Sequence, residues 1–232
     1  MERRVPKRKE EESMASTVVA IDGPAGAGKS TVARLLAREI GASYINTGSL
    51  YRALALAAQH AGIGPGDVPA DFLARQRLEF RGETLYLNGD APGEALRTQE
   101  CAEGASIISK QPAVREYLLD VQRAAAEKQW IVMEGRDIGT VIFPDAACKF
   151  FVTASVEERA RRRLAQQGEV AAGATLASVM AEISRRDERD ANRAVAPLRP
   201  AADAEIVDTT GMTIDEVVTH LAAKVRPLMA AR

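Results

Sequence analysis

The sequence predicts an α/β protein in which a parallel sheet carries helices on both faces, with a small inserted unit beside it. Two features support this prediction. Short apolar runs alternate with longer segments of helical periodicity along most of the 232 residues. The first run, residues 17–21, is rich in β-branched side chains and leads into a glycine-rich turn that opens a helix. Such alternation is typical of parallel sheets, because the crossover helices pack onto the faces of the sheet.

Each predicted element follows from a local pattern. The expected buried strands are short apolar runs, at residues 17–21, 43–45, 130–133, 148–152 and 205–207. The expected helices carry apolar residues along one side, at 29–40, 50–60, 98–108, 112–128, 155–167, 174–193 and 213–228. Thr213 and Glu216 have the spacing of a capping box at the start of the last helix. Because ligands bind at the carboxyl ends of parallel strands, we expect the loops after the strands to form the site.

Residues 64–96 interrupt this alternation. Apolar and polar residues alternate at 78–80 and again at 85–87, with turn residues between and after them, which predicts an antiparallel hairpin. The predicted division of the chain is a disordered charged tail (1–16), a core (17–63 and 97–232) and an insertion that carries the hairpin (64–96).

Composition argues against several classes of protein. Lys and Arg number 31 against 32 Asp and Glu, so the net charge of −1 gives no overall attraction to nucleic acid polymers or membranes. No apolar run approaches the roughly 20 residues of a membrane span, and the start lacks the apolar segment of a secretory signal. Cys101 and Cys148 lack metal-binding or disulfide spacing. A cytoplasmic protein is expected, with neither nucleic acid nor membrane as partner.

A phosphate-binding motif follows the first strand. Residues 23–30, GPAGAGKS, fit G-x-x-x-x-G-K-[ST] and lie between a strand and a helix, as this motif requires. The glycines let backbone N–H groups turn toward a phosphate at the positive end of the helix. Lys29, expected to be solvated, would reach the β- and γ-phosphates, and Ser30 would bind Mg²⁺. The expected ATP-binding residues are Gly23, Pro24, Ala25, Gly26, Ala27, Gly28, Lys29, Ser30 and Thr31.

Clusters of arginine narrow the class of P-loop protein. The sequence lacks the guanine-reading motif Asn-Lys-x-Asp of GTPases, and residues 133–137 do not have the acidic strand end of motor or AAA-type ATPases. Arginine offers phosphate a permanent charge and bidentate contacts, which suits a kinase that moves a phosphoryl group between two anionic nucleotides. The arginines gather at 52, 97, 136, 159–163 and 185–193.

Several stretches of the sequence resemble bacterial cytidylate kinases. They are IDGPAGAGKST, NTGSLYRALA, RTQE with the helix that follows it to Arg115, EGRDIGTVIFPDA and RRDERDANRAVAPL, and they extend from the first strand to about residue 200. The resemblance implies transfer of a phosphoryl group from ATP to CMP or dCMP, with Mg²⁺ as cofactor. A monomer is expected. It also implies that the insertion extends a monophosphate-binding domain and that residues 157–168 form a mobile helical lid.

The same resemblance implies roles for individual residues at the acceptor nucleotide. Arg52 and Arg136 would hold the acceptor phosphate. The residues that would read the cytosine ring are Ser106, Arg115, Asp137 and Arg193. The residues that would hold the sugar are Arg186 and Asp190. Thr47 and Tyr51 complete the expected acceptor-binding set.

In the lid, the resemblance implies that Arg159 or Arg163 contacts the transferring phosphate, and the sequence does not choose between them. With Lys29, Arg52 and Arg136, these two arginines form the expected catalytic set.

The expected metal site uses Ser30 as the direct Mg²⁺ ligand. Glu134, Asp137 and Asp22 are candidates to hold the ion through water, and the sequence does not rank them. Glu134 stands where many cytidylate kinases have Asp, and Thr47 where many have Ser, so phosphate or metal geometry could differ slightly from theirs.

Two other classes of function stay open from the sequence. One is a monophosphate kinase for another base, chiefly UMP, or a small-metabolite kinase of similar fold. The other is a regulatory module that binds ATP without turnover. Release of ADP only in the presence of an acceptor would separate an enzyme from such a module.

Overall fold

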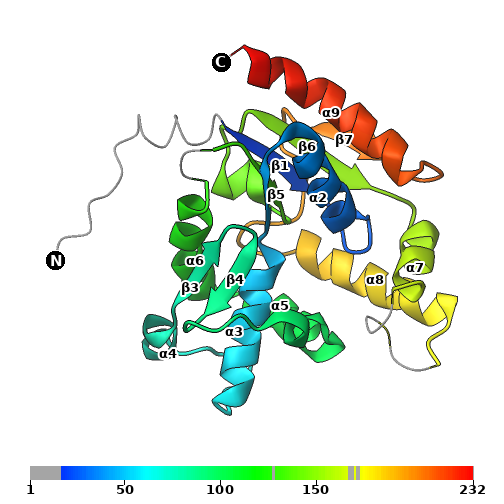
Figure 1. Ribbon diagram of the computed structural model, residues 1–232. Helices are drawn as coiled ribbons and strands as arrows, with labels where there is room; N and C mark the ends of the chain where they lie inside the picture. The colour runs from blue at the N-terminus through cyan, green and yellow to red at the C-terminus, as the bar shows by residue number, and fades with distance from the viewer. Residues whose placement is uncertain (1–16, 127–128, 167–169, 171–172, 232) are drawn as a thin grey trace.

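A parallel sheet forms the centre of the protein (Figure 1), as seen in a computed structural model that describes residues 17–126, 129–166, 170 and 173–231. Within these residues, five strands pair in parallel, with β1 in the middle. In sheet order they are β2 (Ser43–Asn46), β5 (Ile131–Glu134), β1 (Val18–Asp22), β6 (Cys148–Thr153) and β7 (Glu205–Asp208). The predicted parallel fold is confirmed. The predicted tail, 1–16, lies outside the described residues.

Two helices cover one face of the sheet. They are α2 (Lys29–Ile40) and α9 (Ile214–Ala230). Val19 and Ile21 of β1 point toward them and share a buried apolar cluster with Leu221 of α9. The predicted capping box at the start of α9 is present.

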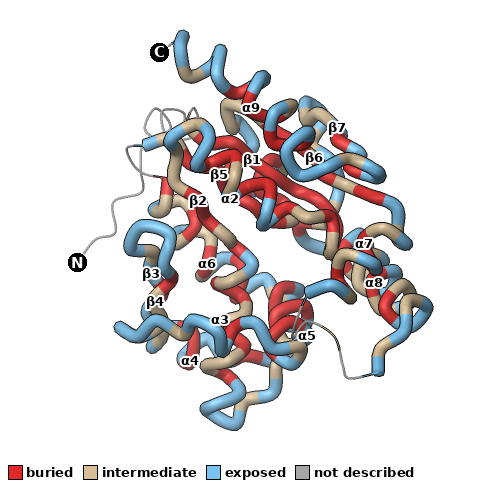
Figure 2. Tube along the Cα trace, turned by 45° about the vertical axis from the view of Figure 1, so that its right-hand side comes forward, coloured by how far each residue is buried: buried red, intermediate tan, exposed pale blue. Residues whose placement is uncertain are grey.

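The opposite face is covered by α6 (Pro112–Ala124) and a π-helical turn (Ile138–Ile142). Val18 and Ala20 of β1 point to this side, because successive strand residues face opposite ways. Every residue of β1 is therefore buried (Figure 2), which is why the strand reads as a continuous apolar run. Helices on both faces are thus confirmed. The π-helical turn had no sequence signal, because its start depends on a contact from β1 that is described below.

A second hydrophobic core joins the inserted segment to neighbouring helices. Leu54, Phe72, Leu85 and Leu118 are buried together in it. Because these side chains come from both inside and outside 64–96, the boundaries of the insertion stay a prediction. The elements around this core are α3 (Gly48–His60), α4 (Ala70–Arg75), β3 (Leu78–Arg81), β4 (Thr84–Leu87), a 3-10 helix (Gly93–Arg97), α5 (Gln99–Ile108) and the start of α6.

The predicted hairpin in this region is confirmed. β3 and β4 pair antiparallel across a two-residue turn, and Gly82 in that turn has a φ of 60°. Helix α4 had not been predicted. Its six residues, between Pro69 and the extended Gln76, are too few to show a helical period.

Helices α7 (Val156–Leu164) and α8 (Leu176–Ala191) pack against each other through a small apolar cluster. The predicted helix at 155–167 ends at Leu164, and the last two residues of the predicted lid, 167 and 168, lie outside the described residues. None of the helices in the described ranges is long and apolar enough to cross a membrane.

Candidate active site

A large cavity opens at the carboxyl ends of the strands, where a parallel sheet is expected to bind its ligand. Its volume is about 1120 Å³. Cationic side chains outnumber carboxylates along its lining, so it suits an anionic ligand. Four expected site residues, Asp22, Gly23, Pro24 and Arg159, do not line it. The expected site residues that do line it are Ala25, Gly26, Ala27, Gly28, Lys29, Ser30, Thr31, Thr47, Tyr51, Arg52, Ser106, Arg115, Glu134, Arg136, Asp137, Arg163, Arg186, Asp190 and Arg193.

The P-loop owes its shape to close packing against β6. Gly23 has a φ of +147°, and a Cβ atom at this position would lie 2.0 Å from the carbonyl oxygen of Val152. Only glycine can occupy such a position without moving the strand. Gly28, with a φ of 83°, then turns the chain into α2. The loop therefore presents its backbone to the cavity at the start of a helix.

Lys29 is buried, and the prediction that it is solvated was wrong. Its side chain folds back over the loop, and Nζ donates a hydrogen bond to the carbonyl oxygen of Pro24 at 2.7 Å. Burial, and then the nearby Arg136 guanidinium, lower the pKa of Lys29 to about 7. An anionic ligand in the cavity would favour the charged form of this amine.

Asp22, the last residue of β1, holds the loop that follows β5. Its two carboxylate oxygens accept hydrogen bonds from the backbone N–H groups of Ile138 and Gly139, each at 2.8 Å. These groups start the π-helical turn directly after Asp137. Burial raises the pKa of Asp22 to about 6, while the two N–H contacts oppose that rise. Asp22 thus fixes the loop that carries Arg136 and Asp137.

Arg115 of α6 and Asp137 form a buried ion pair at one end of the cavity. The contact joins Nη2 of Arg115 to Oδ2 of Asp137. Burial raises the pKa of Asp137, against the opposite effect of the Arg115 and Arg193 guanidinium groups. The Arg115 guanidinium also lies over the ring of Tyr51, 5.9 Å from its centre.

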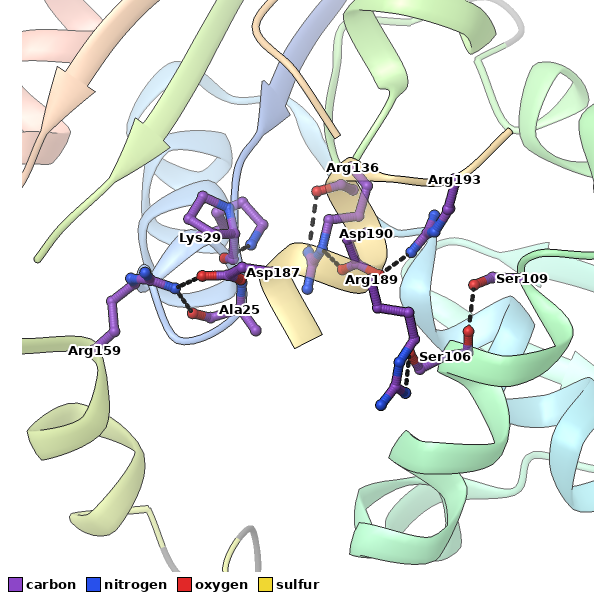
Figure 3. Close-up of polar contacts among 12 residues, drawn as sticks. Ala25, Lys29, Ser106, Ser109, Arg136, Arg159, Asp187, Arg189, Asp190 and Arg193 are labelled. Atoms are coloured by element: carbon purple, nitrogen blue, oxygen red, sulfur yellow. Dashed lines mark hydrogen bonds and ion pairs between the residues drawn. The ribbon is translucent and has the colours of Figure 1, made fainter. Parts of the chain in front are cut away.

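Asp190 of α8 organises a second group of charges (Figure 3). Nε of Arg136 donates to its Oδ2 at 3.1 Å, and Arg193 pairs with its Oδ1. Although burial opposes ionisation, Arg136, Arg193 and Arg186 together lower the pKa of Asp190. Burial, and then Arg136, lower the pKa of Arg186 to about 10. The cluster therefore holds three arginines around one carboxylate and carries excess positive charge.

Three further cavity residues are held by polar contacts with neighbouring elements. The Thr47 hydroxyl donates to the carbonyl oxygen of Glu134 at 2.8 Å. Nη1 of Arg52 donates to the carbonyl oxygen of Leu96 at 2.7 Å. The Ser106 hydroxyl accepts from Nη1 of Arg189 at 3.1 Å, which links α5 to α8 (Figure 3).

The arginines of α7 take different places. Arg163 lines the cavity and pairs with Glu182 of α8 at 2.8 Å. Arg162, which the sequence did not single out within 159–163, also lines the cavity. Arg159 lies behind the P-loop instead, where it contacts Ala25.

Sequence reasoning missed three residues that contact the expected site. Asp187 and Arg189 lie within the stretch RRDERDANR, on the same helix as Asp190, and contact Ala25 and Ser106. Tyr44 donates its hydroxyl hydrogen to Oε1 of Glu134 at 2.6 Å. For Asp187 the one available signal was its spacing of three residues from Asp190, which places both on one side of a helix.

The parallel sheet, the P-loop at the start of α2 and the arginine-rich cavity define a P-loop protein of the kinase type. A family profile described as cytidylate kinase matches residues 19–227. The cytidylate kinase of Mycobacterium leprae (strain Br4923) is 47% identical over 211 residues, which cover 90% of this chain and 95% of that protein. The cytidylate kinase of Pelotomaculum thermopropionicum is 46% identical over 217 residues, which cover 89% and 95%. This chain belongs to the cytidylate kinase family.

Similarity to solved structures shows the fold alone. An uncharacterized protein from Eubacterium ventriosum ATCC 27560 superposes with a TM-score of 0.52 at 11% identity, covering 91% of this chain and 99% of that one.

Proposed function

We propose that this protein transfers the γ-phosphoryl group of ATP to CMP or dCMP, giving ADP and CDP or dCDP. Beside membership of the family, one observation carries the proposal. A phosphate-binding loop and a buried Arg115–Asp137 pair line the same cavity. The loop suits a nucleoside triphosphate. The Arg115–Asp137 pair suits a base that has both hydrogen-bond donors and hydrogen-bond acceptors.

The donor would bind along the P-loop. Backbone N–H groups at the start of α2 would surround the β-phosphate, and Lys29 would exchange its contact with Pro24 for one with the β- and γ-phosphates. Transfer passes through a loose transition state, so catalysis here is positioning and charge stabilisation.

Mg²⁺ would bind where the start of α2 meets the end of β5. Ser30 is exposed at the cavity, and Glu134 lines the same cavity, where Tyr44 fixes its carboxylate. A hydrated Mg²⁺ needs only one or two protein oxygens beside the phosphates, so this pair fits the ion. When bound, the ion neutralises charge on the β- and γ-phosphates. Asp22 and Asp137 are less suited, because Asp22 does not line the cavity and Asp137 pairs with Arg115.

The acceptor phosphate would bind between Arg52 and Arg136, and the sugar beside Arg186 and Asp190. The arginines around Asp190 exceed its single charge, so a phosphate would find unneutralised cations there. On the lid side, Arg163 and Arg162 are the α7 arginines that line the cavity, so they are the candidates to stabilise the charge that develops during transfer.

The base would be read by Arg115 and Asp137, together with Ser106 and Arg193. Cytosine has an amino donor at N4 and acceptors at N3 and O2, whereas uracil has an acceptor at O4 and a donor at N3. Arginine only donates, and an ionised aspartate only accepts, so Arg115 and Asp137 match cytosine and oppose uracil. Each unpaired contact costs about 1–3 kcal/mol. Two of them predict a preference for CMP over UMP of roughly 10²–10⁴ in kcat/KM.

The experiment that tests this function is ADP release with each of CMP, dCMP, UMP, AMP and GMP, and with no acceptor. We expect rapid release with CMP and dCMP, slow release with the others and almost none without an acceptor. Equal rates with UMP and CMP would contradict the proposed reading of the base. Tight ATP binding without acceptor-dependent release would indicate a non-catalytic module.

A further inference from the structure

Ala25 of the P-loop is held by both of its backbone polar groups (Figure 3). Its N–H donates to Oδ1 of Asp187 at 3.4 Å, and its carbonyl oxygen accepts from Nη1 of Arg159 at 3.0 Å. The same Nη1 donates to Oδ2 of Asp187 at 2.5 Å. The ion pair therefore holds both backbone polar groups of one residue, with Arg159 on α7 and Asp187 on α8.

These contacts of Arg159 and Asp187 with Ala25 hold the P-loop, and Arg159 does not face the cavity. The side chain of Arg159 is 6% exposed, its Nε donates to the carbonyl oxygen of Ala154, and the residue does not line the cavity. The backbone of α7 also packs directly on the loop. A Cβ atom on Gly26 would lie 3.1 Å from the carbonyl oxygen of Arg159. Charge-assisted hydrogen bonds with so little exposure to water are strong enough to fix the loop.

Helix α8 also contacts the acceptor side of the cavity within the same turn. Asp190, three residues after Asp187, pairs with Arg136 and Arg193. Arg189 donates to the Ser106 hydroxyl on α5. One turn of α8 thus touches the donor loop, the loop after β5 and the helix beside the acceptor pocket. A ligand that shifts the contacts of Asp190 or Arg189 must act on a rigid helix that also holds Ala25.

We propose that Asp187 is a positioning residue that couples the acceptor site to the P-loop through Arg159 and Ala25. Rearrangement of the Asp190 cluster around an acceptor moves the turn that carries Asp187. The position of Ala25 then sets the direction of the backbone N–H groups that follow it in the loop. Acceptor binding therefore raises the affinity for the donor, and by linkage the donor raises the affinity for the acceptor by the same factor. This inference rests on the proposed function, because it takes the two ligands to be nucleotides.

The test measures coupling rather than activity alone. The dissociation constant of a non-hydrolysable ATP analogue with Mg²⁺ is measured by calorimetry, with and without saturating CMP, and the reciprocal titration is run as well. We expect the wild-type protein to gain roughly 5- to 150-fold in affinity, the usual range for coupled sites. In Asp187→Asn, which removes the ion pair but keeps the shape, the gain should fall close to onefold. The matched control is Glu188→Gln, the same chemical change at the next, exposed residue, and it should keep the wild-type gain.

A second variant, at the other residue of the ion pair, tests whether the loss in Asp187→Asn comes from the ion pair itself. Arg159→Lys keeps a cation but has one nitrogen on a shorter side chain, so it cannot contact Ala154 through one nitrogen and Ala25 and Asp187 through another, as Arg159 does, and it should lose most of the gain. The double variant should lose no more than Asp187→Asn alone, because both residues act through one contact. Unfolding temperatures within a few degrees of wild type would show that the variants are folded.

Three results would overturn the inference. They are a wild-type gain near onefold, a full gain in Asp187→Asn, or an equal loss in Glu188→Gln. Failure of the proposed function looks different, because CMP would then not support ADP release. In that case the same titrations are run with the acceptor that does support it, and the coupling through Asp187 is judged on that acceptor.

Discussion

The donor loop and the acceptor pocket share one cavity but are built in opposite ways. The loop is one stretch of chain, residues 23–31, and it offers mainly backbone N–H groups. Its shape follows from packing, as at Gly23, where no Cβ atom fits. The pocket takes side chains from α3, α5, α6, α8, the segment after α8 and the loop after β5. Several of its charged side chains already pair with one another.

This difference follows from the cost of buried charge. Backbone amides at a helix start are polar but uncharged, so the loop needs no charged partner before phosphate binds. Buried arginines and aspartates cannot, because an unpaired charge in the interior is expensive. The Arg115–Asp137 pair is therefore neutral before a ligand binds, and the Asp190 carboxylate offsets part of the charge of the three arginines around it. Changes in the loop should mainly lower the rate, whereas changes in the pocket should also affect specificity and stability.

The largest effect should come from Lys29→Met, in the donor loop. Loss of a charge directed at the transferring group should lower kcat by about 10²-fold or more. The fold should survive, because Met removes a buried amine whose pKa is already lowered to about 7 and leaves a side chain of similar length. The measurement is steady-state kinetics with CMP, alongside the thermal unfolding midpoint. A near-normal kcat would mean that the phosphate-binding loop is assigned wrongly.

Arg52→Met tests the part of the pocket that is assigned to phosphate alone. Its loss should lower kcat/KM by roughly 10²-fold, since it removes one charge-assisted phosphate contact. The fall should be equal for CMP and UMP, because both carry the same phosphate. A change in the ratio of the two values would mean that Arg52 also senses the base.

The same contrast explains how much the sequence could predict. The donor loop was predicted residue by residue, because its motif is contiguous and its strand–helix setting is visible in the sequence. The pocket residues were named only through resemblance, since spacing alone cannot bring α5 and α8 together. Spacing also could not separate Arg159 from Arg163, although one lies behind the loop and the other lines the cavity. The burial of Lys29 was missed because its place at a helix start suggested solvent.

Arg115→Met tests the reading of the base. It removes a donor that cytosine needs and that uracil opposes, so it should lower activity on CMP more than on UMP. The CMP/UMP ratio of kcat/KM should shrink by roughly 10-fold or more, from a contact worth about 1–3 kcal/mol. The variant also leaves Asp137 buried without its partner, so it should unfold at a lower temperature. Arg52→Met is the matched control, because the same type of substitution there should leave the ratio unchanged.

The smallest effect on activity should come from Asp22→Asn, which lies between the two regions. Asp22 directly precedes the donor loop, yet both of its oxygens hold the loop that carries Asp137. Asparagine can accept only one of these two hydrogen bonds and sets its own N–H₂ group against the other N–H. The free energy of unfolding should therefore fall by about 1–3 kcal/mol. Relief of a buried carboxylate, whose pKa is raised to about 6, should keep the loss near the lower end.

Asp22→Asn also separates a structural carboxylate from a metal-holding one. If Asp22 holds the loop after β5, the Mg²⁺ concentration for half-maximal activity should stay at its wild-type value. The variant should nevertheless unfold at a lower urea concentration. Glu134→Gln makes the same chemical change at a carboxylate that lines the cavity, and it should raise the Mg²⁺ requirement instead. A raised requirement in Asp22→Asn with unchanged stability would assign Asp22 to the donor site. Asp22→Asn should change the stability against urea, whereas Glu134→Gln should change the Mg²⁺ requirement. Titrations with Mg²⁺ and with urea therefore decide whether Asp22 belongs to the donor site or to the loop after β5.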